Sequence, residues 1–302
     1  MPRLFVTTNN HIFLVEYSTR RKRFSVERLW SKYSWFTGCD WDDHYIYVAA
    51  RDSPHFGGKL GETIIRFDRR LRFVDVWYRS RQVLDMHQIC VLDGSLWITN
   101  TYHNGFRVLN IETRVEQDYF PYNNGTVPGS FERGDRNHFN TIRTDGKQLF
   151  IIANNYVVRD GLRKRRSNSR LLIVDPEQRR ITRDVAVRGK AAHDVWIEDG
   201  SFRTFDSARG VICGPDAAAY WTGEPWLRGV AITDRIMFIG KSVLATSEQR
   251  AVGNGEVCAV DRRTGRIIAR AEVPGSGGIF DMLLLDERDL ARFHKPAFLE
   301  PT

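Results

Sequence analysis

The sequence predicts an all-β fold, a six-bladed β-propeller, from three observations. A unit of several short strands recurs about every 50 residues, which is typical of propeller blades. Each unit begins with an apolar run, a short turn such as Asp-Gly, and a second apolar run. The two chain ends hold incomplete units that complement each other. First strands are expected near Thr37, His87, His138, His193, Arg228 and Phe280, at spacings of 50, 51, 55, 35 and 52 residues.

The remaining strands follow from alternating apolar segments between these starts. Three N-terminal strands, "RLFVTT", "HIFLVEYS" and "RFSVERLW", have no first strand of their own. They are expected to complete the blade begun by 280–285, because closing the ring removes free sheet edges. The unit that begins at His193 contains "PDAAAYWTGEPW", which is a poor strand sequence, so a degraded blade is expected there. A single propeller domain over residues 1–302 is therefore predicted, with helical pattern only in "ERDLARF".

Composition is that of a folded globular protein. Of 302 residues, 42% are hydrophobic and 12% aromatic, which is too apolar for a disordered chain. We find no apolar run of 18 residues and no signal-peptide pattern in "MPRLFVTTNN", so no membrane association is expected. The four cysteines lack the paired spacing of a zinc site and are expected to be buried free thiols. Together these observations predict a cytoplasmic protein.

The net charge of +8 is concentrated in two basic runs. They are "RRKRF" at 20–24 and "RKRRSNSR" at 163–170. Such runs can contact phosphate, but they also serve as solvated loops or as protection for a strand edge. Since no recognised nucleic-acid-binding motif accompanies them, nucleic acid is not an expected partner.

Loop lengths distinguish the two faces of the predicted ring. Turns between first and second strands are short, whereas the connections that return to the other face are long. The long connections are 51–62, 118–137, 154–169 and 241–255. Long loops on a rigid scaffold usually carry function. The face on which the first strands begin is therefore the expected functional face.

Three histidines stand at the starts of three predicted first strands on that face. Equivalent positions of a radial repeat converge on one axis, so His87, His138 and His193 are expected to share a pocket. Three imidazoles suit zinc, iron, manganese or copper, and suit calcium poorly. A divalent transition metal is the expected cofactor. The alternatives are a metal-free polar pocket and histidines that only satisfy backbone groups around a water-filled channel.

Further polar residues are expected near the same mouth. Arg228, Asn140 and Asp206 are candidates for substrate binding, and Arg228 could hold a carboxylate or phosphate in its guanidinium fork. Equally, Arg228 could form a structural salt bridge and Asp206 could fix the following turn.

Candidates for acid–base catalysis complete the predicted site. Asp281 could move protons or orient a ligand imidazole. His55 and His103 are catalytic candidates from the loops of the same face. The alternatives are a structural salt bridge for Asp281 and ordinary surface positions for the two histidines.

Four segments resemble a bacterial propeller family of undefined function. They are "HFNTI", "HDVWIEDGSFRTFDSARG", "WLRGVAITDRIMFIGKS" and "GGIFDMLLLD", in the same order, over about residues 135–288. The resemblance implies a propeller and places His138, His193, Arg228 and Asp281 at recurrent positions. It implies no activity, and the loop 241–255 departs from the Pro-rich form of the family. More distantly, the architecture is similar to six-bladed lactonase and strictosidine-synthase-like enzymes, although the Asp, Asn and Glu ligands of the calcium lactonases are not reproduced.

Two functions follow as hypotheses. The first is a metal-dependent enzyme of hydrolase, lyase or isomerase type, in which the metal polarises a carbonyl or activates water on a small polar or anionic substrate. The second is a non-catalytic module that grips a protein or carbohydrate partner, since propellers serve both roles. A closed histidine-lined pocket would favour the enzyme, and a channel plugged by side chains would favour the module.

Overall fold

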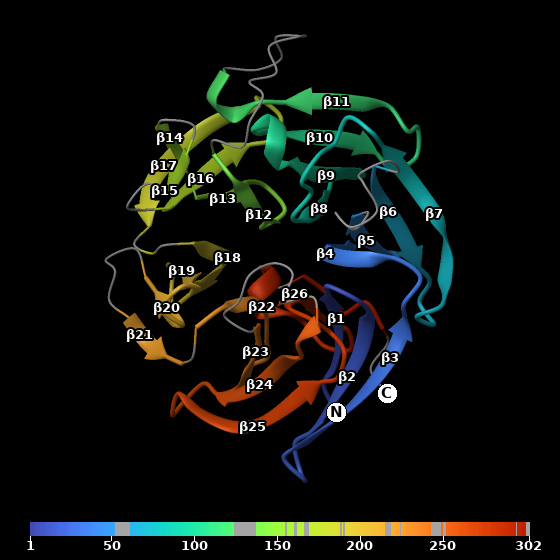
Figure 1. The fold of residues 1–302 in the computed structure, drawn as a ribbon, viewed down its shortest axis with the longest axis vertical. Helices are drawn as coiled ribbons and strands as arrows, with labels where there is room; N and C mark the ends of the chain where they lie inside the picture. Colours follow the sequence, from blue (N-terminus) through green and yellow to red (C-terminus); the bar gives the residue numbers. More distant parts are fainter. Residues whose placement is uncertain are drawn as a thin grey trace.

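The fold is a ring of six four-stranded antiparallel sheets, as Figure 1 shows for the computed structural model. The prediction of a six-bladed propeller is confirmed. The structure describes residues 1–51, 61–123, 137–154, 156–159, 162–165, 169–187, 189, 191–214, 219–223, 225–242, 249, 252–293 and 295–299.

Blades 1 to 3 follow one another along the chain. Blade 1 contains β4 (Ser34–Trp41), β5 (Ile46–Arg51), β6 (Glu62–Phe67) and β7 (Phe73–Ser80). Blade 2 contains β8 (Ile89–Leu92), β9 (Ser95–Asn100), β10 (Gly105–Asn110) and β11 (Glu116–Tyr119). Blade 3 contains β12 (Phe139–Thr144), β13 (Leu149–Ala153), β16 (Ser169–Asp175) and β17 (Arg180–Val187). A separate hairpin, β14 (Tyr156–Arg159) and β15 (Leu162–Arg165), is inserted in blade 3.

Blades 4 to 6 close the ring. Blade 4 contains β18 (Ala192–Glu198), β19 (Ser201–Asp206), β20 (Val211–Cys213) and β21 (Ala219–Thr222). Blade 5 contains β22 (Leu227–Ile232), β23 (Ile236–Lys241), β24 (Gly255–Asp261) and β25 (Arg266–Val273). Blade 6 contains β26 (Ile279–Leu284), β1 (Arg3–Thr8), β2 (Ile12–Ser18) and β3 (Arg23–Trp30).

Blade 6 joins the two ends of the chain, as expected. β26 pairs antiparallel with β1, with Phe5 opposite Leu283 and Val6 opposite Met282. Their side chains alternate between neighbouring blades: Val6 packs toward Phe238 of blade 5, and Phe5 packs toward Phe67 of blade 1. The termini therefore fasten the ring through one shared sheet with a buried core on both faces.

Blade 4 corrects one expectation. It is not degraded, because β21 forms within the segment that we expected to be a poor strand. Its two outer strands are nevertheless the shortest pair in the ring, at 3 and 4 residues. The pairing of β20 with β21 shifts register between Ile212 and Cys213, and this β-bulge accommodates an extra residue in β21.

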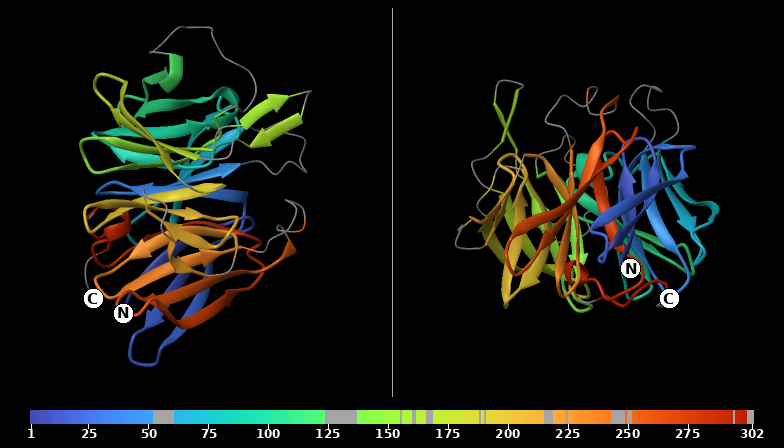
Figure 2. Two further views of the ribbon diagram at one scale, coloured as in Figure 1. Left: turned by 90° about the vertical axis from the view of Figure 1, so that its left-hand side faces the viewer. Right: turned by 90° about the horizontal axis from the view of Figure 1, so that it is seen from below.

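The two faces of the ring differ as predicted from loop lengths. The hairpin β14–β15 projects from one face, and the N- and C-termini lie toward the other (Figure 2). After β26 the chain forms a short 3-10 helix, η4 (Leu290–Arg292), which contacts β18 and β22. Phe293 then stacks on Phe150 of β13, with ring centroids 4.5 Å apart. The C-terminal segment thus crosses the plain end of the channel.

The sequence also led to expectations about the cysteines and about membrane-spanning segments. All four cysteines are buried and free, as predicted. Within the described ranges, helices are too short and too polar to cross a bilayer.

Candidate metal centre

The starts of the first strands of blades 1 to 5 repeat one backbone conformation. Positive φ values between 47° and 67° occur at Trp35, Asp85, His138, Ala191 and Trp226. The carbonyl of the next residue accepts a side-chain hydrogen bond from the preceding blade, as in Thr37 Oγ1 to Met86 O and Asn140 Nδ2 to Ala192 O. This repeated pair of features defines the structural register of the blades.

The register corrects the sequence alignment of the three histidines. His138 occupies the position of Asp85, and Asn140 occupies the position of His87. His87 and His193 are equivalent, as expected, but His138 lies two residues earlier in its repeat. The prediction was wrong here because apolar runs and Asp-Gly turns do not reveal a shift of two residues at a strand start.

Asp85, His87 and His138 come together at the channel mouth between blades 2 and 3. Each offers one ligand atom, and these atoms all lie within 4.8 Å of one another. The two imidazole rings meet edge to face, with centroids 4.8 Å apart. His87 Nε2 lies 3.6 Å from Asp85 Oδ2. The shift of two residues is what allows this contact, because it places His138 opposite an aspartate and a histidine of the neighbouring blade.

Arg51 and Glu62 of blade 1 lie against this group. Arg51 Nη1 contacts Asp85 Oδ1 at 2.6 Å, and Glu62 Oε1 accepts a 3.0 Å hydrogen bond from the Asp85 N–H. Three buried atoms, Arg51 Nη2, Glu62 Oε2 and His87 Nε2, have no hydrogen-bond partner among the described residues. Buried polar atoms are normally satisfied, so three such atoms in one cluster indicate a place for a ligand.

Charge states in this group suit a metal site. Burial lowers the pKa of His87 to about 3, helped by the Arg51 charge, so the ring is neutral at physiological pH. Burial would raise the pKa of Asp85, but Arg51 and His87 hold it well below its usual range. Burial raises the pKa of Glu62 to about 7. A neutral imidazole beside an ionised carboxylate is the state in which both bind metal ions.

The two carboxylate oxygens of Asp85 contact different neighbours. Oδ1 is held by Arg51, whereas Oδ2 faces His87 Nε2. Metal–ligand bonds of about 2.0–2.2 Å would require the three ligand atoms to approach to about 3.3 Å, a change within reach of side-chain rotation. Arg51 would then orient a ligating carboxylate from outside the coordination sphere. Two imidazoles and one carboxylate leave further coordination positions for water or substrate.

His193 is not part of this group. Its Nδ1 lies 2.8 Å from both Ala191 O and Ser207 Oγ, and Ser207 Oγ donates to Leu227 O. Because a carbonyl can only accept, Nδ1 carries the proton. The Ser207 hydroxyl, in turn, connects blade 4 to Leu227 of blade 5. The structure therefore brings together two of the three expected ligands and adds Asp85.

One layer below the mouth, a network of buried charges fills the axis. Arg143 Nη2 contacts Asp194 at 2.7 Å and Asp281 at 3.1 Å, and Arg292 Nη2 contacts Asp281 at 2.7 Å. Gln88 Oε1 accepts from Arg143 Nη1 at 2.7 Å. Two arginines and two aspartates balance, so four buried charges are paired with excellent hydrogen bonding.

Backbone donors connect this network to the remaining blades. Asp281 Oδ2 accepts from the Cys39 N–H of blade 1, and Asp194 Oδ2 accepts from the Gly229 N–H of blade 5. Gly229 has φ +73°, a conformation that glycine adopts without strain. Every blade thus contributes at least one group to this central layer, which blocks the axis below the mouth.

The predicted catalytic role of Asp281 does not fit this position. Its side chain is fully buried, and both oxygens are engaged by Arg143, Arg292 and the Cys39 N–H. A carboxylate with all its acceptor sites occupied cannot approach a substrate without breaking the network. Asp281 is instead the electrostatic centre of the ring.

Two predicted substrate-binding residues have other contacts in the structure. Arg228 belongs to blade 5, across the mouth from blade 2, and its guanidinium lies 5.2 Å from the Phe280 ring centroid. It also lines a hollow of about 10 Å³, which is too small for a substrate. Asn140 is buried, and its side-chain amide donates a hydrogen bond to Ala192 O, so it connects blade 3 to blade 4.

The other predicted residues are also placed elsewhere. Asp206 is buried at the end of β19, with Oδ2 3.7 Å from Arg209 Nε, as expected for a residue that fixes a turn. His103 belongs to the 3-10 helix η2 (Thr101–His103), and its Nδ1 lies 2.9 Å from Asn100 Oδ1. His55 lies outside the described residues.

Sequence reasoning missed Asp85, Arg51 and Glu62. The spacing Asp-x-His at Asp85 and His87 was a usable signal, since two potential ligands flank one buried methionine. Arg51 and Glu62 stand at the end of β5 and the start of β6. Only the closed ring shows that these strand ends meet the start of blade 2.

Comparisons with known proteins support the fold alone. No protein-family model and no curated protein sequence matches this chain. Among solved structures, it is similar to a chain of the nidogen/laminin complex, with TM-score 0.65, 10% identity, and coverage of 93% of this chain and 97% of that chain. It is also similar to a protein of unknown function from Bacteroides caccae, with TM-score 0.58, 11% identity and the same coverages. By likeness of fold, the chain is a six-bladed β-propeller.

Proposed function

We propose that the protein binds a divalent transition metal at Asp85, His87 and His138 and uses it to act on a small polar or anionic molecule. The observation that carries the proposal is the convergence of these three side chains beside buried polar atoms that have no hydrogen-bond partner in the described part of the chain. Two imidazoles and a carboxylate are a ligand set for zinc or iron(II), with manganese and copper as alternatives.

The chemistry of the surroundings supports a reaction of hydrolase, lyase or isomerase type. A bound metal would polarise a carbonyl or lower the pKa of water. Arg51 would orient Asp85, and its Nη2, which has no hydrogen-bond partner among the described residues, could hold an anionic group of the substrate. Glu62 is a general-base candidate, since burial raises its pKa to about 7 and its Oε2, 3.9 Å from Arg51 Nε, accepts no hydrogen bond from the described residues.

Elemental analysis of protein purified without chelator tests the metal. We expect about one equivalent of zinc, iron, manganese or copper in the wild type, and loss of that metal in Asp85→Asn and His138→Gln. The matched control is His103→Gln, a histidine of the same face bonded to Asn100. Little metal in the wild type, unchanged in His138→Gln, would count against the proposal.

Catalysis needs a second measurement. A panel of small esters, lactones and hydroxy acids would be assayed with protein carrying metal and with protein stripped by chelator. We expect turnover that disappears on stripping and returns with metal. Turnover that survives the loss of metal in His138→Gln would reject the metal mechanism.

A non-catalytic binding module is the second candidate, and the blocked axis is the observation that favours it. The central network confines any ligand to the mouth and the face above it. Such a module would bind a protein or carbohydrate partner with equal affinity in wild type and in metal-free His138→Gln. An enzyme of the first type would instead lose substrate binding and turnover with its metal.

A further inference from the structure

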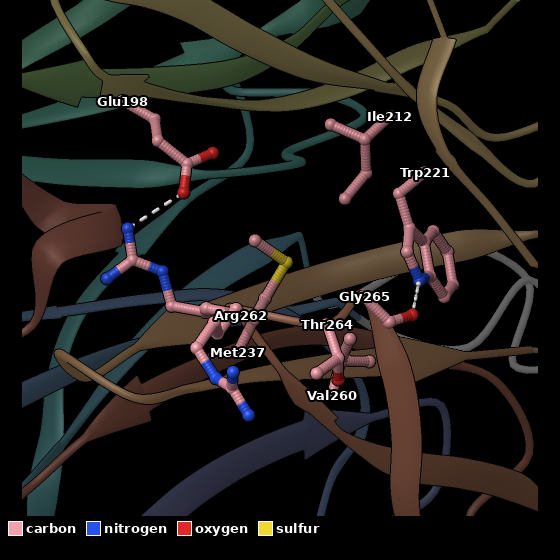
Figure 3. A pocket seen from close by; sticks show the side chains of 9 residues that line it. Glu198, Ile212, Trp221, Met237, Val260, Arg262, Thr264 and Gly265 are labelled. Atoms are coloured by element: carbon pink, nitrogen blue, oxygen red, sulfur yellow. Dashed lines mark hydrogen bonds and ion pairs between the residues drawn. The ribbon is translucent and has the colours of Figure 1, made fainter.

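A second cavity lies between blades 4 and 5 at the plain face, away from the metal group. Its volume is about 250 Å³. It opens beside the turn between β24 and β25, with the end of β18 on its other side, and Figure 3 shows its lining. Neither the predicted function nor the metal centre uses this cavity.

The inner wall of the cavity is apolar. Ile212, Met237, Val260 and Trp221 belong to one hydrophobic cluster and line it together. A wall of aliphatic side chains, a thioether and an indole favours a flat apolar ligand, because sulfur and aromatic faces pack well against aromatic rings.

The indole of Trp221 is held in place before any ligand arrives. Its Nε1–H donates to Gly265 O at 3.0 Å, across the gap between the two blades. Gly223 lies against the ring, since a Cβ there would come within 2.2 Å of the indole. A side chain larger than hydrogen would displace the ring. The glycine therefore leaves room for the indole, and the hydrogen bond to Gly265 O orients it, which lowers the entropy lost on binding.

The rim of the cavity carries excess positive charge. Arg262 is paired with Glu198 at 2.7 Å, and its Nε is buried without a hydrogen-bond partner among the described residues. Arg263 is exposed and has no salt-bridge partner in the described part of the chain. Two arginines against one glutamate at the rim favour an anionic group there.

We propose that this cavity binds a small aromatic carboxylate, with its ring against Trp221 and Met237 and its carboxylate at Arg263. The size agrees, because an apolar cavity of about 150 Å³ accommodates benzene, and about 100 Å³ more leaves room for a short acid side chain. The proposal does not depend on the proposed function, since the metal group lies at the other face of the ring, beside blades 1 to 3.

Titration calorimetry with phenylacetate and its neutral isostere phenylacetamide tests the proposal. The full chain is used with chelator present, so that the metal centre cannot contribute. We expect phenylacetate to bind with a Kd on the order of 1 mM, and phenylacetamide about fivefold more weakly. Equal affinity for the acid and the amide, or no binding of the acid at 20 mM, would overturn it.

Two variants locate the bound acid. Arg263→Gln should weaken phenylacetate about fivefold and leave phenylacetamide unchanged, whereas Arg266→Gln in the same turn region should change neither. Trp221→Phe should weaken both ligands, because it removes the bond to Gly265 and part of the contact area. Equal losses in Arg263→Gln and Arg266→Gln would overturn the assignment, as would unchanged binding in Trp221→Phe. His138→Gln should bind phenylacetate like the wild type.

Discussion

Two charged clusters of this propeller, one at the centre of the ring and one at the channel mouth beside blades 1 to 3, differ in how many of their polar atoms have hydrogen-bond partners. In the central layer, Arg143, Asp194 and Asp281 engage each other and backbone groups of several blades. Arg292 is the fourth member, and its Nε is the one side-chain atom of the four with no partner among the described residues. At the mouth, Arg51, Glu62 and His87 each have a buried atom without a hydrogen-bond partner in the described part of the chain.

This difference in hydrogen bonding distinguishes a cluster that stabilises the fold from one that can bind a ligand. A balanced network with its hydrogen bonds made fixes the positions of the blades, and removing one member leaves buried charge uncompensated. An incomplete network costs stability unless something else completes it. We therefore expect the centre to control folding and the mouth to control binding.

The largest effect is expected at the centre. Asp281→Asn leaves Arg143 and Arg292 with one aspartate between them, in a site without water access to replace the charge. The free energy of unfolding should fall by about 3–5 kcal/mol. Urea denaturation followed by tryptophan fluorescence measures it. A loss below about 1 kcal/mol would show that the network does not hold the blades.

Asp289, which precedes η4 below the central layer, should give a pH-dependent change in the free energy of unfolding of similar size. Burial raises the pKa of Asp289 to about 6, although Arg292 and three backbone N–H donors favour the ionised form. A folded-state pKa above the unfolded value of about 3.8 contributes stability below pH 4, and this contribution is lost as pH rises through 6. About two pKa units correspond to about 3 kcal/mol.

Comparison of wild type with Asp289→Asn isolates this contribution. The variant cannot ionise at this position, so its stability relative to wild type should increase between pH 4 and 7. Urea denaturation at intervals of half a pH unit follows the difference. A difference that stays constant across this window would mean that Asp289 is already ionised at pH 4.

Substitutions at the mouth should affect metal binding more than the free energy of unfolding. In metal-free protein, His138→Gln should change the free energy of unfolding by less than about 1 kcal/mol, because this side chain is only half-buried. Asp85→Asn should cost more, because it removes the ion-pair partner of Arg51. Saturating metal at 100 times its Kd should stabilise the wild type by about 2.7 kcal/mol and leave both variants unchanged. A large loss in metal-free His138→Gln would make the mouth a second structural cluster.

The fold could be predicted from sequence because its signals are local and repeated. Apolar alternation and short turns recur along the chain, four of the five spacings between first strands lie near 50 residues, and the orphan strands at the two ends predict closure. The outer strand of blade 4 could not be predicted, since β21 depends on pairing with β20 rather than on its own composition.

The site was only partly predictable because it depends on register. His87 and His138 are recognisable as strand-start residues, but their contact requires an offset of two residues that only the backbone conformation reveals. The roles of Arg143 and Arg292 depend on where the chain ends cross the axis, which no local pattern encodes. Asp281 was recognised as important at the axis, but its bonding partners decide that its role is structural.

His193 provides the smallest and sharpest test of the comparison. It stands at the repeat position of His87, yet its Nδ1 is bonded to Ala191 O and Ser207 Oγ between blades 4 and 5. His193→Gln should therefore change the Kd for zinc by less than twofold, whereas His138→Gln should weaken it at least a hundredfold. Competition with a chromophoric chelator measures both values. Equal losses in the two variants would contradict this placement and make His193 a ligand, as the repeat position alone predicted.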